Sequence, residues 1–230
     1  MRQVSAKNSL VFMVLLSILF SCESEEHGKK IKEGVVEYTI DYVKKTDNQL
    51  VQALLPTSVN FKFDPEHTKT SFSGSLGFYE LSYLANNETE TWSILYQLKR
   101  NIYLYEQKLD EPKLLGHEIE ILEIQETNET KKIANYTCRK LKIITNSDEY
   151  KESEIYYTDK IRFDFPTLLN LFGKIDGILM EFELPEKDML LHVTAKSVES
   201  KEIDKEEFAI PEKAQRIKKS MMVDLLNTEF

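Results

Sequence analysis

Cysteine, histidine and long apolar runs are scarce in this chain of 230 residues. The longest apolar run, residues 10–20, is interrupted only by Ser17, but it covers about half of the roughly 30 Å hydrocarbon core of a bilayer. No Gly-x-Ser-x-Gly elbow and no phosphate-binding loop is present. Each histidine lacks a second ligand at the spacing of a metal site: His27, His67, His117 and His192. These absences argue against a membrane-spanning helix and a metal site, and we predict no enzyme, no catalytic residues and no cofactor.

Basic residues are in the minority. Lysine and arginine number 30 against 39 aspartates and glutamates, which gives a formal net charge of −9. Affinity for a phosphate backbone depends on lysines and arginines that release counterions, so this balance argues against nucleic acid as a partner.

The N-terminus has the organisation of a bacterial lipoprotein signal. Arg2 and Lys7 precede the apolar run, and Ser21 is followed at once by Cys22. A small residue directly before a cysteine distinguishes a lipoprotein signal peptide from an ordinary one, because the thiol is lipidated and becomes the mature N-terminus. We therefore expect residues 1–22 to be a signal peptide ending at a Cys22 that carries acyl chains such as palmitate. Multiple acylation anchors a protein firmly in a membrane without a helix.

Residues 23–26 place three glutamates directly after that cysteine. They resemble the acidic export tags that send lipoproteins of some Gram-negative bacteria to the outer face of the outer membrane. The alternative is a solvated tether, and residues 23–32 are charged enough to be flexible in either case. The predicted localisation is the outer membrane, lipid-anchored, on its periplasmic or cell-surface face.

The remainder of the chain is long enough for one domain. Removal of residues 1–22 leaves 208 residues, and it raises the formal negative charge from −9 to −11 because Arg2 and Lys7 are lost. We expect a single domain over residues 33–230. If Cys22 carries lipid, Cys138 has no partner within the chain and the fold cannot depend on a disulfide. Burial of the Cys138 thiol is the favoured interpretation, with catalysis or pairing to a second chain as alternatives.

Apolar and polar residues of this domain alternate, mostly with a period of two residues. Val36, Tyr38, Ile40 and Tyr42 alternate with polar residues, as in a strand with one buried face. Comparable segments, separated by turn residues, predict strands over residues 36–42, 59–64, 70–75, 78–84, 91–98, 102–106, 118–127, 136–145, 153–158, 178–184 and 189–197. The predicted fold is mainly β, a curved antiparallel sheet or open half-barrel with two or three short helices.

Two of these helices are expected between strands. Asp47 caps one over residues 47–55, and Pro166 opens another over residues 166–172. Gly177, just before a predicted strand, is interpreted as a backbone requirement, either a turn or a close approach where a Cβ would clash.

The third helical segment is expected from about residue 211. Ala214, Ile217, Met221 and Leu225 fall there at helical spacing. The basic residues between them are interpreted as the solvated face of a capping helix, with anionic headgroups or an acidic partner as the alternative.

Residues 129–184 resemble a known family. The order of segments 129–140, 155–161 and 173–181 is similar to that of the GLPGLI family of exported bacterial proteins and its uncharacterised relatives. Such proteins lead through Thr-Lys-Lys-Ile into Tyr-x-Cys, continue with a Tyr-Thr strand, and turn through glycine into an apolar strand. Residues 208–211 also resemble the Phe-x-x-Pro that often closes such folds. The resemblance implies the fold of the outer-membrane lipoprotein carriers, whose curved half-barrel wraps around helices and holds acyl chains, and it brings no catalytic residues.

Aromatic residues are the candidate ligand-binding residues. Tyrosine and phenylalanine number 11 and 12, and many occupy alternating strand positions. A concave sheet lined by them would hold an apolar ligand, whereas ordinary core packing is the alternative for any single one. The candidates are Tyr38, Tyr42, Phe61, Phe63, Trp92, Tyr96, Tyr103, Tyr105 and Phe182.

The leading functional hypothesis is a non-enzymatic cell-envelope lipoprotein that binds a hydrophobic or lipid-like ligand in a half-barrel. The second is a structural or interaction module tethered to the outer membrane, with an unknown protein partner. An enzyme ranks last, since it requires a cleft of clustered polar groups with shifted pKa values.

Overall fold

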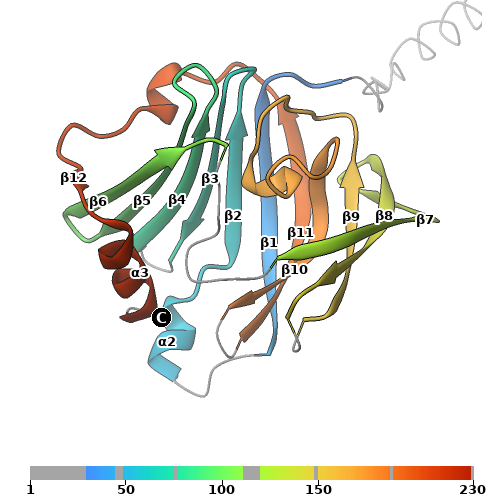
Figure 1. Cartoon of the computed structure of the whole chain (residues 1–230), viewed down its shortest axis with the longest axis horizontal. Helices are drawn as coiled ribbons and strands as arrows, with labels where there is room; N and C mark the ends of the chain where they lie inside the picture. The colour runs from blue at the N-terminus through green and yellow to red at the C-terminus, as the bar shows by residue number, and fades with distance from the viewer. Residues whose placement is uncertain are drawn as a thin grey trace, which may run out of the picture.

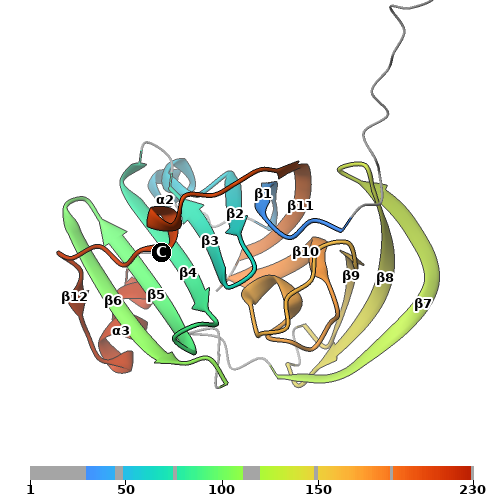
Figure 2. The same cartoon turned by 90° about the horizontal axis from the view of Figure 1, so that it is seen from above.

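The computed structural model describes residues 30–44, 49–74, 77–110, 120–147, 150–186 and 189–228. Within them the protein is mainly β, and the strands form one curved, open sheet that does not close into a barrel (Figure 1, Figure 2). The strands in chain order are β1 (Gly34–Lys44), β2 (Ser58–Phe63), β3 (His67–Ser73), β4 (Tyr79–Asn86), β5 (Thr91–Leu98), β6 (Asn101–Lys108), β7 (Ile121–Ile133), β8 (Tyr136–Thr145), β9 (Glu152–Thr158), β10 (Ile178–Glu186), β11 (Met189–Ser200) and β12 (Gln215–Arg216).

The sheet is built from two meanders that meet at its centre. The spatial order is β12-β6-β5-β4-β3-β2-β1-β11-β10-β9-β8-β7, and β1 pairs with β11 where the meanders join. All neighbours are antiparallel except the short β12, which runs parallel to β6. Hairpin connections join most antiparallel neighbours, whereas residues 159–177 join β9 to β10 and the chain crosses from β6, beside one edge of the sheet, to β7 at the other edge. The fold class predicted from the period of two is confirmed, and each of the eleven predicted strands is present.

The strand registers define two ends of the sheet. At the first, which we call the Gly34 end, Gly34 pairs with Phe63 and Ser200. At the second, the Lys44 end, Lys44 pairs with Leu190, which also pairs with Pro185. The chain enters β1 at the Gly34 end, where Figure 1 shows the segment that leads into this strand.

Side chains alternate between the two faces of the sheet, and each face has its own apolar cluster. The larger cluster occupies the concave face, and residues 159–177 lie inside the curve of the sheet and pack against it (Figure 2). On the opposite face, Leu84, Leu95 and Leu104 pack under Ile210 and Ala214. The segment that follows β11 therefore covers the outer face before it reaches β12.

Helices are few and short within the described residues. They are α2 (Gln49–Leu54), the 3-10 helices η2 (Leu168–Asn170) and η3 (Lys205–Phe208), and α3 (Lys219–Thr228). The first two fall inside the segments predicted to be helical. Among the described residues, no helix is long and apolar enough to cross a membrane.

The C-terminal helix differs from the prediction. It begins at Lys219 and not near residue 211, because residues 215–216 instead pair with β6. Met221 is 46% exposed, whereas Met222 and Leu226 pack into the main core. Ile217 and Leu225 also pack against this core, so Met221 is the one of the large apolar residues at helical spacing that faces solvent.

Gly177 occupies the close approach expected of it. Its φ is +155°, and a Cβ at this position would lie 2.1 Å from the Thr158 carbonyl oxygen. Any larger residue would therefore push β9 and β10 apart where β10 begins.

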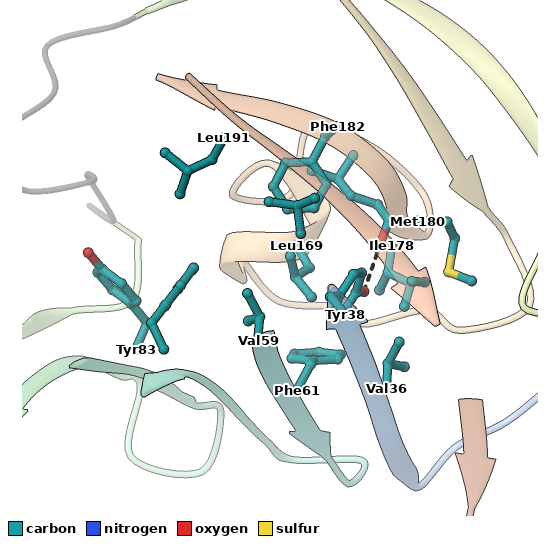
Figure 3. Close-up of a cluster of buried hydrophobic side chains, with 14 of the residues drawn as sticks. Val36, Tyr38, Val59, Phe61, Tyr83, Leu169, Ile178, Met180, Phe182 and Leu191 are labelled. Carbon is teal, nitrogen blue, oxygen red and sulfur yellow. Dashed lines mark hydrogen bonds between the residues drawn. The ribbon is translucent and has the colours of Figure 1, made fainter. Parts of the chain in front are cut away.

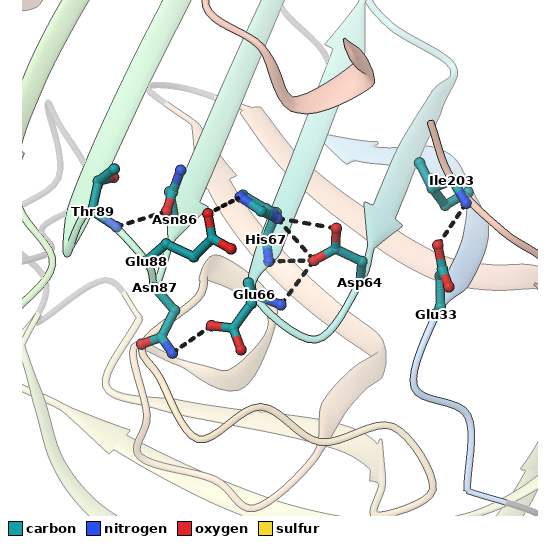
Figure 4. Close-up of polar contacts among 9 residues, drawn as sticks. All are labelled: Glu33, Asp64, Glu66, His67, Asn86, Asn87, Glu88, Thr89 and Ile203. Carbon is teal, nitrogen blue, oxygen red and sulfur yellow. Dashed lines mark hydrogen bonds and ion pairs between the residues drawn. The ribbon is translucent and has the colours of Figure 1, made fainter. Parts of the chain in front are cut away.

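Polar contacts fasten the Gly34 end (Figure 4). In the β2–β3 turn the buried Asp64 carboxylate accepts hydrogen bonds from the backbone N–H groups of Glu66 (2.8 Å) and His67 (2.7 Å). The His67 Nδ1 atom lies 3.0 Å from the same carboxylate. Nearby, the Ile203 N–H donates to Glu33 Oε1 at 2.7 Å. Aspartate favours such turns because its side chain bonds the following backbone amides.

Candidate functional site

A large cavity lies between the concave face, the segment 159–177 and α3. Its volume is about 1570 Å³, which exceeds the roughly 300–1,000 Å³ common for small-molecule sites. Its walls are predominantly aliphatic and aromatic. The apolar lining residues are Tyr38, Val59, Phe72, Tyr105, Ile121, Ile143, Tyr150, Ile155, Pro166, Leu168, Leu169, Leu171, Phe172, Leu179, Phe182, Leu184, Pro185 and Val223.

The exposed lining residues mark where the cavity meets solvent. Glu152 and Glu183 stand toward the Lys44 end of the sheet, together with Glu120 and Asn146, which bond each other through backbone and side chain. The exposed Asp110 also lines the cavity, and it follows β6 at the Gly34 end. Lysines border the cavity too: Lys174 donates to the Ile121 carbonyl at 2.9 Å. An apolar interior with a charged border suits an amphipathic ligand.

We call residues 159–177 the plug. It connects the Gly34 ends of β9 and β10 and fills part of the concave face. Phe163 packs edge-on against Phe61 (5.9 Å between ring centroids) and Phe63 (5.6 Å). These aromatic contacts attach the first half of the plug to β2.

A buried amide organises the second half of the plug. Asn170 is 1% exposed, and its Oδ1 accepts from the N–H groups of Thr167 (2.8 Å) and Gly173 (2.7 Å). Its Nδ2 donates to the Phe165 carbonyl at 2.9 Å. The Thr167 hydroxyl accepts in turn from the Asn170 N–H at 3.2 Å, which completes a capping box around η2. One side chain thus satisfies backbone groups that would otherwise be buried without partners.

This network holds two cavity-lining residues in the left-handed region. Leu171 has φ 50° and Phe172 has φ 58°, a conformation that costs of order 1–2 kcal/mol for a residue with a Cβ. The Phe172 N–H donates to the Thr167 carbonyl at 2.8 Å. The Asn170 hydrogen bonds therefore offset backbone strain that turns both side chains toward the cavity.

Tyr38 and Phe182 form one wall of the cavity (Figure 3). Their rings meet edge-on with centroids 6.3 Å apart. The Tyr38 hydroxyl donates to the Leu179 carbonyl at 2.9 Å, and burial raises the pKa of that hydroxyl well above its ordinary value. The group therefore stays a neutral donor that fixes the wall.

The structure brings three of the nine predicted aromatic residues to the cavity, namely Tyr38, Tyr105 and Phe182. The other six lie in the packed interior or beside it. Phe61 and Phe63 stack on each other at 5.5 Å, and the Tyr42 hydroxyl donates to the Pro56 carbonyl at 2.8 Å. The remaining three are Trp92, Tyr96 and Tyr103.

Most of the cavity lining was missed by sequence reasoning. The plug supplies Leu168, Leu169, Leu171 and Phe172, and α3 supplies Val223. These residues have no alternating pattern because they belong to a loop and a helix. The signal for the plug was the apolar composition of residues 168–172 after Pro166. Other missed lining residues, such as Val59, Phe72 and Ile143, lie on strands whose alternation is visible in the sequence.

Cys138 is buried, as predicted. Its thiol is 0% exposed, and burial raises its pKa to about 12. The thiol is therefore protonated at neutral pH and is a poor nucleophile. Cys22, the predicted lipidation site, lies outside the described residues.

Both described histidines lie beside carboxylates, and His67 Nε2 is 3.9 Å from Glu88 Oε2. His67 faces Asp64, and His192 Nε2 lies 3.6 Å from Glu181 Oε1. In the part of the chain that the structure describes, no three His, Cys, Asp or Glu side chains gather as a metal site would require. His27 and His117 lie outside that part.

No protein-family model matches the chain, and no curated protein matches it. The fold class is an open, curved antiparallel sheet. The candidate site is defined by the cavity that the sheet, the plug and α3 enclose.

Proposed function

We propose that this protein is a non-enzymatic cell-envelope lipoprotein that holds a hydrophobic or lipid-like ligand in the cavity of its half-barrel. The observation that carries the proposal is a cavity of about 1570 Å³ with apolar walls and a charged border. A core formed only for stability is close-packed and leaves few voids larger than a water molecule. A ligand with an acyl chain and a polar head matches both parts of the lining.

The resemblance to the GLPGLI family and to the outer-membrane lipoprotein carriers agrees with this proposal. So does the predicted address, in which a lipidated Cys22 anchors the protein in the outer membrane of a Gram-negative bacterium. Labelling with palmitate tests the address, since wild type should incorporate label and Cys22→Ser should not. Equal labelling of both would remove the basis for an anchor at Cys22.

The strand registers favour one orientation of the sheet relative to the predicted membrane anchor. The chain enters the sheet at the Gly34 end, whereas several exposed lining residues stand at the Lys44 end. Residues 23–30 span at most about 28 Å when fully extended, and the 11 residues of β1 span about 36 Å. We therefore propose that the anchor and the Lys44 end face in opposite directions, so that the protein exchanges ligand away from its own anchor.

A pair of tryptophan substitutions on α3 tests ligand binding. Val223 lines the cavity, so Val223→Trp should reduce the lipid that co-purifies with the full chain. Met221 on the same helix is 46% exposed and does not line the cavity, so Met221→Trp should retain the co-purifying lipid. Native mass spectrometry followed by solvent extraction measures the bound lipid. Wild-type protein that carries no lipid and takes up none from vesicles would refute the proposal.

A second candidate function is an interaction module without a ligand. Exposed apolar side chains favour it, and three of them stand at the Lys44 end: Val43, Phe78 and Leu122. Such residues mark protein-binding surfaces when they gather. A protein that co-purifies with wild type, and is lost when these three are replaced by serine while bound lipid is unchanged, would favour this candidate.

A further inference from the structure

Phe172 separates the cavity from the only tryptophan of the chain. The Phe172 side chain lines the cavity, and its ring stands edge-on against Trp92 with 5.5 Å between centroids. Trp92 itself is 1% exposed and lies behind this contact, outside the lining. The Phe172 ring is therefore the part of the wall that keeps a ligand from reaching Trp92.

The position of this wall follows from strand pairing. Trp92 pairs with Ala85, Ala85 with Thr68, Thr68 with Phe63, and Phe63 with Gly34. This row of residues places Trp92 at the Gly34 end of the sheet. A chain that enters from the Lys44 end, with its polar head left at the charged border there, meets Phe172 after the aliphatic part of the cavity. At the level of Trp92 the lining becomes polar, with Gln107, which pairs with Trp92, and Asp110.

The wall is held in place by the backbone. Phe172 has φ 58°, and its N–H donates to the Thr167 carbonyl at 2.8 Å. Asn170, which is 1% exposed, bonds to the residues on either side of this turn, at Thr167 and Gly173. A ring presented by a strained and fully hydrogen-bonded turn is a rigid boundary and does not adapt to each ligand.

We propose that Phe172 sets the maximum length of apolar chain that the cavity accepts, so that the protein selects single-chain amphiphiles by chain length. The inference rests on the proposed function, because it requires that the cavity holds an acyl chain. Each methylene that finds room in an apolar site strengthens binding by about fourfold. Methylenes that would extend beyond the Phe172 ring meet Trp92 behind it or the polar side chains of Gln107 and Asp110, and they add nothing to the affinity.

Saturated fatty acids of increasing length test the proposal on the full chain. With laurate, myristate, palmitate, stearate and arachidate, the affinity of wild type should rise with length and then level off. Phe172→Ala should move this plateau to longer chains, with about a fourfold gain in affinity for each methylene newly accommodated. Phe172→Leu removes less volume and should move the plateau by a smaller step. This variant replaces Phe172→Ala in the test if the alanine variant fails to fold.

Phe163→Ala is the matched control. Phe163 is also a half-buried phenylalanine of the plug, but it packs against Phe61 and Phe63 and does not line the cavity. Removal of the Phe163 ring should leave the plateau at the same chain length as in wild type. A plateau that shifts equally in both variants, or in neither Phe172 variant, would overturn the role of Phe172.

Trp92 supplies an independent readout because it is the only tryptophan. Stearate brominated near its methyl end quenches indole fluorescence on contact, so it should quench Phe172→Ala more strongly than wild type or Phe163→Ala. Equal quenching in all three would count against Phe172 as the boundary. Wild type that binds no fatty acid of any length would overturn the proposed function and this inference together, whereas binding without a shifted plateau overturns only the inference.

Discussion

The two ends of the sheet are built in different ways. At the Gly34 end, buried polar side chains bond the backbone: Asp64 holds the β2–β3 turn, and Asn170 holds the plug that enters from this end. At the Lys44 end, apolar side chains such as Leu122 remain in solvent, and exposed carboxylates border the cavity. Side chains bond backbone groups at the Lys44 end too, but the Asn146 bond to Glu120 is exposed there. The difference teaches that buried polar bonds fix the plug at the Gly34 end, whereas the end with exposed bonds and exposed lining residues is the one suited to binding.

Removal of the Asn170 amide should have the largest effect on stability. Asn170→Ala leaves several buried backbone groups without partners and releases the strained turn at Leu171 and Phe172. We expect a loss of about 3 kcal/mol in the free energy of unfolding by urea. Asn128→Ala, an exposed asparagine of β7, should change it by less than about 0.5 kcal/mol. Similar losses in both variants would show that the plug is not fastened by Asn170.

A pair of turn variants compares the two ends directly. Asp64 is buried at the Gly34 end, and Asn146 is exposed at the Lys44 end, where its Oδ1 accepts from the Glu120 N–H at 2.8 Å. Asp64→Ala should cost about 2 kcal/mol and Asn146→Ala less than about 1 kcal/mol, because water replaces only the exposed bond. Thermal unfolding of both variants measures the difference. Equal shifts of the midpoint would contradict the asymmetry between the ends.

Alkaline pH should lower the free energy of unfolding because of Cys138, which lies near the Gly34 end of β8. The unfolded thiol loses its proton near its ordinary pKa of 9.0, whereas burial keeps the folded thiol protonated until about pH 12. Stability from this group is thus fully present below pH 9 and falls as the pH rises toward 12, by at most about 1.4 kcal/mol per pH unit. Urea unfolding at several pH values measures the slope. Cys138→Ala should show a shallower decrease of the free energy of unfolding with pH. Identical slopes in wild type and Cys138→Ala would refute the assignment of this pH dependence to the Cys138 thiol.

The smallest change is expected at the Lys44 end. Leu122 is 62% exposed, so Leu122→Gln should alter the free energy of unfolding by less than about 0.5 kcal/mol. Leu141 on the neighbouring strand is 3% exposed, and Leu141→Gln should cost several times more. A large loss from Leu122→Gln would mean that this residue packs against the domain, and the contrast between the ends would weaken.

Local patterns predicted the strands and the burial of particular residues. Val36, Tyr38 and Ile40 alternate with polar neighbours because one face of β1 is buried, and that period is visible in the chain itself. The burial of Cys138 and the close approach at Gly177 were also predicted from their place in or beside strands. The start of α3 was not, because the pairing of residues 215–216 with β6 is a long-range contact.

The cavity was only partly predictable. Tyr38, Tyr105 and Phe182 line it as expected, yet Phe61, Phe63 and Trp92 have the same strand alternation and lie in the packed interior. Alternation assigns a residue to the concave face, but it does not say whether another segment covers that residue. The plug covers Phe61, Phe63 and Trp92 through Phe163 and Phe172.

The amino-acid sequence by itself determined the strands, their buried faces and the mainly β class, because these depend on neighbours two residues apart along the chain. The lipoprotein signal predicted at Cys22 lies outside the described residues. Only the tertiary structure decided that the sheet stays open, that the plug is fixed by Asn170, and that a cavity remains between the plug and α3. A cavity is the volume that packing leaves unfilled, so it depends on how segments far apart in the chain meet and has no pattern of its own in the sequence.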